Sequence, residues 1–237
     1  LSPAPLSGRD MMYDQNYRHN LTIRRTLEAV MHSYHGERSG DEWNAFTVYL
    51  KRVWFSNGIH HHYSTKKFLP GFSTEYFDRL LSGSDSALLP LADGESVASL
   101  RDRLKPILFD SSLDAKRVNK DAGVDLIADS ANNYYENVTQ VEVEAFYEKM
   151  GGEGDARPIS YGLNSKLIKE NGVMYERTWK LGGMYSAAIE RVVYWLEQAV
   201  QVAENSEQRR ALELLVAYYR TGQLRTFDHY NIAWVQD

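Results

Sequence analysis

The chain has 237 residues, a formal net charge of -5 and no cysteine. Hydrophobic residues make up 43% and charged residues 25%, which is typical of a folded globular protein. The acidic balance argues against nucleic acid as a partner, and the lack of cysteine excludes disulfides, thiolate metal sites and cysteine nucleophiles. No stretch approaches the roughly 20 consecutive apolar residues that span a bilayer, so we expect no membrane-spanning segment.

Apolar periodicity predicts a helical N-terminal part over residues 1–109. Asn20 can cap the first helix and Gly36 can close it, while Gly58 offers the left-handed conformation that ends the second. Residues 59–71 have no period and contain a Pro-Gly pair, which is typical of a loop. The predicted helices lie near residues 20–34, from 39 or 41 to 57, 73–81 and 95–104.

The second part, residues 110–237, is predicted to mix strands and helices. Thr139 and Glu142 match a capping box, so a helix should follow and run to about Met150. The glycine-rich residues 151–155 are the best candidate for a flexible joint. Short strands are predicted at residues 124–128 and 158–161.

Asn171-Gly172 is the dipeptide that best fits a type I′ turn, and it predicts a hairpin of residues 165–168 and 173–179. After Gly182-Gly183, apolar spacing predicts a long helix, then an antiparallel partner over residues 206–221 that Gly222 closes. A last helix is predicted from Thr226. It still carries apolar residues at the end of the sequence, which slightly favours a chain cut from a longer one, although natural C-terminal helices also end bluntly. The fold class is therefore α+β, rich in helices with a small mixed or antiparallel sheet.

His60, His61 and His62 form the cluster that most invites a metal, since imidazole is a common zinc ligand. Neighbouring residues of a strand point to opposite faces, which leaves only His60 and His62 on one side, and no carboxylate lies nearby to complete a site. We therefore expect no metal here. The loop should be irregular, with at least two of the histidines accessible to solvent.

No complete catalytic motif is present. The chain lacks H-E-x-x-H, G-x-S-x-G, a Walker A loop and G-x-G-x-x-G, so we assign no catalytic residue. Residues 130–136 gather amides and phenols, including Asn132, Asn133 and Tyr134. This composition suits hydrogen bonding to an extended ligand and equally suits a turn that leads into the Thr139 cap.

Five stretches of the chain together resemble the dipeptidyl peptidase III family of zinc exopeptidases, and most of all its bacterial branch. No single one of them is a catalytic signature. The matching stretches are Asn20–Ala29 (NLTIRRTLEA), Val48–His62 (VYLKRVWFSNGIHHH), Ile159–Lys169 (ISYGLNSKLIK), Gly182–Glu197 (GGMYSAAIERVVYWLE) and Phe227–Asp237 (FDHYNIAWVQD).

The resemblance implies a two-lobed metallopeptidase that releases dipeptides from peptide N-termini. This chain would be its lower lobe, a helix-rich lobe with a small mixed or antiparallel β-barrel or sheet. The family's zinc motif lies downstream of the matched segment, so zinc and the catalytic lobe belong to the full-length protein and this chain alone should be inactive. The family's peptide contact in the loop that matches residues 57–68 places Tyr63 against substrate. The expected substrate-binding residues are Asn57, His60, His61, His62, Tyr63, Asn132, Asn133 and Tyr134.

The sequence thus predicts one wall of a peptide-binding cleft, with peptide substrate and the missing C-terminal catalytic lobe as partners. A free-standing peptide-binding or scaffold domain without activity is the alternative. A small histidine-loop metal protein is a third possibility. We expect a cytoplasmic location, with the periplasm as the alternative.

Overall fold

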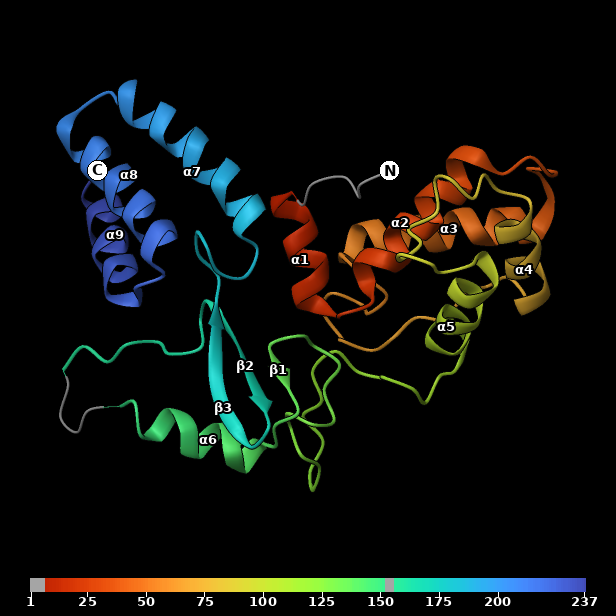
Figure 1. Cartoon of the computed structure of the whole chain (residues 1–237), viewed down its shortest axis with the longest axis horizontal. Helices are drawn as coiled ribbons and strands as arrows, with labels where there is room; N and C mark the ends of the chain where they lie inside the picture. Colours follow the sequence, from red (N-terminus) through yellow and green to blue (C-terminus); the bar gives the residue numbers. More distant parts are fainter. Residues whose placement is uncertain (1–6, 152–155) are drawn as a thin grey trace. The chain divides into compact units, whose positions relative to one another are not determined.

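The computed structural model describes residues 7–151 and 156–237 (Figure 1). Within them the chain divides into two compact units. The first comprises residues 12–133, and the second comprises residues 134–237 together with residues 7–11. Residues 110–133 therefore belong to the helical unit, and the functional division that the sequence suggests at residue 110 stays a prediction. The predicted joint at residues 151–155 lies, apart from Gly151, outside the described residues.

The first unit is helical, and serine side chains begin two of its helices. Ser73 Oγ accepts a hydrogen bond from the Tyr76 backbone N–H, and Ser96 Oγ accepts one from Ser99, so each satisfies a backbone donor that a helix start leaves open. The helices that lie wholly in this unit are α2 (Asn20–Ser33), α3 (Gly40–Ser56), α4 (Thr74–Ser82) and α5 (Val97–Phe109). The fold class predicted for this part is confirmed, and α5 extends five residues beyond the predicted end.

One apolar core fills this unit. It draws on every one of its helices, and its largest fully buried side chains are aromatic and aliphatic. They include Tyr17, Ile23, Leu27, Phe46, Tyr49, Leu50, Ile59, Phe77, Leu80 and Leu100. Because Tyr17 and Ile59 stand outside the helices, the core also fixes the segments on either side of α2 and α3.

The second unit holds a three-stranded mixed sheet of order β1-β2-β3, which does not close into a barrel. β1 (Tyr135–Glu136) runs parallel to β2 (Ser165–Glu170), and β2 runs antiparallel to β3 (Val173–Thr178). Asn171 and Gly172 have φ angles of 51° and 79°, the positive values that a type I′ turn needs, so the predicted hairpin is confirmed.

Helix α6 (Gln140–Glu148) begins with the predicted capping box, in which Thr139 and Glu142 each bond the other's backbone. The helix lies against the hairpin, as Figure 1 shows. The Tyr147 hydroxyl donates to Glu176 Oε1 at 2.9 Å, and Lys169 Nζ lies 2.5 Å from Glu142 Oε1. Helix α6, which the sequence predicts, therefore packs against the sheet.

Two strand predictions were wrong. Residues 124–128 form turns, because Asp125 Oδ1 accepts hydrogen bonds from the backbone N–H groups of Ile127 and Ala128 and bends the chain locally. Residues 158–161 have no strand pairing. The third strand comes instead from β1, whose two residues are too few to carry a period in the sequence.

The second unit ends in three consecutive helices, α7 (Ser186–Gln201), α8 (Ser206–Thr221) and α9 (Leu224–Gln236). α8 packs against both α7 and α9, so the predicted pair is confirmed and is extended by a third member. Gly222 closes α8 at φ 72° as predicted, with its N–H bonded to the Tyr218 carbonyl at 2.7 Å. α9 begins two residues before the predicted Thr226, directly after Gln223.

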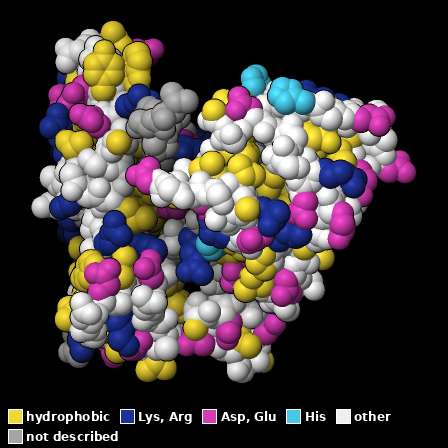
Figure 2. Space-filling model, turned by 45° about the vertical axis from the view of Figure 1, so that its right-hand side comes forward, with side chains coloured by type: hydrophobic (Ala, Val, Ile, Leu, Met, Phe, Trp, Pro, Cys, Tyr) yellow, Lys and Arg dark blue, Asp and Glu magenta, His cyan; other side chains and the backbone are white. Residues whose placement is uncertain are grey.

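Charged side chains of both signs are interspersed on the face seen in Figure 2, in keeping with the small net charge. No helix among residues 7–151 and 156–237 is long and apolar enough to cross a membrane. Among the same residues, no group of three or more His, Asp or Glu side chains is placed to hold a metal ion.

Candidate functional site

The predicted histidine loop begins where α3 ends, and α2 holds it in place. Asn57 caps α3 in the left-handed conformation. Asn20 Oδ1 then accepts a hydrogen bond from the Ile59 backbone N–H at 3.1 Å, and its Nδ2 donates to the Asn57 carbonyl at 3.4 Å. Asn20 was expected to cap α2, but the cap position is His19, and the buried Asn20 amide instead fixes the loop.

Gly58 allows this close approach. Its φ is 142°, and a Cβ built on it would lie 2.0 Å from Asn20 Nδ2, so any other residue here would force the Asn20 amide to move. A glycine is therefore required at this position for two reasons, the backbone conformation and the space.

His60 lies beneath the loop and is only 2% exposed. Its Nε2 is 2.8 Å from the Asp114 carbonyl oxygen, and its ring meets that of Tyr17 edge to face, with the ring centres 5.3 Å apart. Tyr17 donates its hydroxyl hydrogen to Asp114 Oδ2 at 2.5 Å. Burial lowers the pKa of His60 to about 4, so the ring is neutral at pH 7 and acts as an internal anchor.

His61 and His62 differ from His60, because both reach the surface. The alternation expected of a strand does not apply, since residues 62–64 form a turn. His61 Nδ1 accepts hydrogen bonds from the backbone N–H groups of Tyr63 and Ser64, each at 3.2 Å. His61 thus shapes the turn that presents Tyr63. The predicted irregular loop with two accessible histidines is confirmed.

Four aromatic rings contact one another in sequence along this surface, and we call them the aromatic ladder: Phe55, His61, His62 and Tyr63. The ring centres of His61 and His62 are 4.7 Å apart at an interplanar angle of 21°, and those of His62 and Tyr63 are 4.2 Å apart. Phe55 meets His62 at 4.8 Å. Tyr63 is 84% exposed and Phe55 75%, so the ladder offers an unusual amount of ring surface to solvent.

The far side of the loop is fixed by residues 115–118. The Arg117 backbone N–H donates to the Thr65 carbonyl at 2.8 Å, and Arg117 Nη1 donates to Asn16 Oδ1 at 2.7 Å. Lys67 Nζ donates to the carbonyls of Ile107, Asp110 and Leu113. The ladder therefore stands on a loop that hydrogen bonds hold from two directions.

The amides of residues 132 and 133 are used inside the first unit. Asn132 Nδ2 donates to the Arg117 carbonyl at 3.2 Å. The buried Asn133 donates from Nδ2 to Asp14 Oδ2 at 3.2 Å. Tyr134 begins the second unit, where its carbonyl accepts from Leu167 N–H at 3.0 Å. Of the two roles that the sequence left open, these contacts favour the structural turn.

The sequence missed three residues that define this region. Phe55 is not among the residues that the sequence singles out, yet its ring is 75% exposed at the end of α3. Asp114 and Arg117 lie in a stretch without periodicity, and their roles depend on contacts 54 to 101 residues away in the chain. No local pattern signals such contacts.

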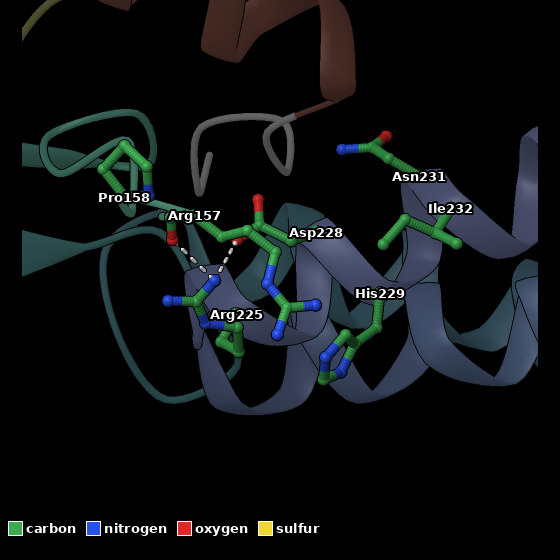
Figure 3. Close-up of a pocket in the computed structure, with 7 residues that line it drawn as sticks. All are labelled: Arg157, Pro158, Arg225, Asp228, His229, Asn231 and Ile232. Carbon is green, nitrogen blue, oxygen red and sulfur yellow. Dashed lines mark hydrogen bonds and ion pairs between the residues drawn. The ribbon is translucent and has the colours of Figure 1, made fainter. Parts of the chain in front are cut away.

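The second unit has a hollow of about 550 Å³ between the segment before β2 and the exposed side of α9 (Figure 3). Arg225 Nη1 donates to the Arg157 carbonyl at 2.9 Å and lies 3.5 Å from Asp228 Oδ2. The side chains that line it are Arg157, Pro158, Arg225, Asp228, His229, Asn231 and Ile232. No sequence motif marked it.

Comparison with known proteins gives one family and two curated relatives. Residues 164–237 match the family model of peptidase family M49. Dipeptidyl peptidase 3 of Rattus norvegicus is 25% identical over 222 residues, and that of Homo sapiens is 24% identical over 221. Each alignment covers 83% of this chain and 29% of the relative, so the chain spans less than a third of the length of the curated relatives it matches.

Proposed function

We propose that the chain is the non-catalytic portion of a zinc-dependent dipeptidyl peptidase of the dipeptidyl peptidase III family, peptidase family M49, and its similarity to that family supports the proposal. In this proposal the chain forms one wall of the cleft that holds a peptide whose N-terminal dipeptide is removed. The catalytic lobe of the same protein supplies the zinc and the general base.

The aromatic ladder is the observation that supports this role. A peptide laid across exposed rings removes apolar surface from water, and covering one side chain of this size contributes about 1.5–3 kcal/mol. Tyr63 adds a hydroxyl that can donate to a peptide carbonyl. Because the loop is already held by Asn20, His60 and Arg117, little conformational freedom is lost when the peptide binds.

Within the part of the chain that the structure describes, no group of side chains fits a zinc site. His60 Nε2 bonds the Asp114 carbonyl and His61 Nδ1 accepts two backbone N–H groups, so the histidine loop lacks three imidazole nitrogens directed at one point. A zinc site for hydrolysis needs three protein ligands and an open position. We therefore derive no catalytic step within this chain, and its part is to bind and orient the peptide.

The test uses the longer protein of the uninterrupted reading frame, loaded with zinc, and a dipeptidyl-naphthylamide substrate. Tyr63→Ala should raise KM about tenfold and change kcat little, because it removes a binding surface and no reacting group. Tyr194→Ala is the matched control, since this tyrosine is 54% exposed on α7 and lies outside the ladder. An unchanged KM for Tyr63→Ala, or an equal effect of the control, would refute the role of the ladder.

A further inference from the structure

The hollow of Figure 3 has an excess of positive charge and a partly apolar wall. Arg157 and Arg225 supply two guanidinium groups and Asp228 supplies one carboxylate, so these three side chains together carry one net positive charge. Ile232 and Pro158 contribute apolar surface. A volume of about 550 Å³ lies within the range of roughly 300–1,000 Å³ that is usual for small-ligand sites.

Arg225 is oriented by its neighbours and still reaches solvent. Nη1 donates to the Arg157 carbonyl at 2.9 Å and lies 3.5 Å from Asp228 Oδ2, which fixes the plane of the guanidinium. The side chain remains 39% exposed, and that of Asp228 37%. A guanidinium has five N–H donors, so it can keep these protein contacts and also bond an anion.

The lining distinguishes between anions. A phosphate dianion carries about twice the charge that this hollow offers, and Asp228 would repel it more strongly than a monoanion. A carboxylate matches the single net charge and the planar fork of a guanidinium. Ile232, which is 51% exposed, offers a surface for an apolar group attached to that carboxylate.

We propose that this hollow binds the C-terminal carboxylate of a short peptide, with its last side chain against Ile232 and Pro158. The carboxylate chemistry follows from the lining, whereas the choice of a peptide rests on the proposed function. The aromatic ladder belongs to the first unit and the hollow to the second, so this is a separate contact point for peptides. Asn231 supplies an amide that can bond the last peptide group.

The test measures binding to the 237-residue chain by nitrogen-15 NMR titration with three probes: the dipeptide Ala-Leu, its C-terminal amide, and inorganic phosphate. The dipeptide should shift the resonances of α9, and the amide should bind about tenfold more weakly because it lacks the charge-assisted hydrogen bonds. Phosphate should also bind more weakly than the dipeptide. Equal affinity for the amide, or tighter binding of phosphate, would overturn the proposal.

Arg225→Gln should weaken dipeptide binding about tenfold. Arg220→Gln is the matched control, because Arg220 lies on α8, is 51% exposed, pairs with Glu197 and does not line the hollow. It should leave the affinity within about twofold, and an equal loss in both variants would count against the site. The comparison of the dipeptide with its C-terminal amide uses the unaltered chain, so it tests the carboxylate site even if a variant folds poorly. The ladder is tested by the KM of Tyr63→Ala in the longer protein, whereas the hollow is tested by NMR binding to the 237-residue chain. Failure of one proposal can therefore be told from failure of the other.

Discussion

Replacing the buried His60 with glutamine should make the first unit less sensitive to acid. Burial lowers the pKa of this imidazole from 6.5 to about 4, so between these values the unfolded chain binds a proton that the folded chain refuses. The contribution of the neutral ring to stability is therefore complete above pH 6.5. It is lost progressively as the pH falls toward 4.

The size of the effect follows from those two values. Because pH 5 lies 1.5 units below the unfolded pKa of 6.5, the imidazole of the unfolded chain is protonated, whereas that of the folded chain is still neutral. This difference lowers the free energy of unfolding by about 2 kcal/mol relative to pH 7.5. Burial also lowers the pKa of His19 to about 4, but this ring is only partly buried, so solvent screening makes its contribution smaller than that of His60. His60→Gln should remove only the contribution of His60.

The assay is urea unfolding at pH 7.5 and pH 5, followed by the fluorine NMR signals of fluorotryptophan at Trp43 and Trp54, which both lie in the first unit. The difference in the free energy of unfolding between pH 7.5 and pH 5 should be about 2 kcal/mol smaller in His60→Gln than in the native chain. His32→Gln is the control, because His32 is exposed on α2 and its loss should leave that difference unchanged. An unaltered pH dependence in His60→Gln would refute the reasoning.

Two further predictions concern stability alone. Gly58→Ala should destabilise the first unit by about 3 kcal/mol in urea unfolding, because the new Cβ would strike Asn20 at a φ that alanine rarely adopts. Gly40→Ala is the control in the same unit, since Gly40 also has a positive φ but a Cβ there meets no atom within 4 Å, and it should cost only about 1 kcal/mol. A similar cost for both would contradict the close approach. Thr139→Ala should lower the stability of the second unit by about 1 kcal/mol through loss of the capping box, and Thr139→Ser should retain it, as thermal unfolding can measure.

Local chemistry made several elements predictable from the sequence. The Asn171-Gly172 turn, the Thr139 capping box and the Gly222 helix end each depend on residues within a few positions of one another, and each is confirmed. Helix α3 was also predictable, since its apolar residues recur at helical spacing. Such features need no knowledge of distant contacts.

Distant contacts explain what the sequence did not predict. β1 has two residues and exists because Leu167 bonds the Tyr134 carbonyl across 33 positions, so no period can signal it. The three adjacent histidines look equivalent in the sequence. In the structure His60 is buried and bonds the Asp114 carbonyl, whereas the turn at Tyr63 leaves His61 and His62 at the surface. The hollow beside α9 likewise depends on Arg157, which lies 68 residues before Arg225.

The central claim is that this chain binds peptide but needs the rest of its protein for catalysis. The most direct test compares the 237-residue chain with the protein of the full reading frame on a dipeptidyl-naphthylamide, with and without added zinc. We predict zinc-dependent turnover by the longer protein and none by the chain alone, because residues 7–151 and 156–237 hold no group of side chains placed to bind a metal ion. Zinc-dependent turnover by the chain, abolished when His60 and His62 are replaced with alanine, would contradict it.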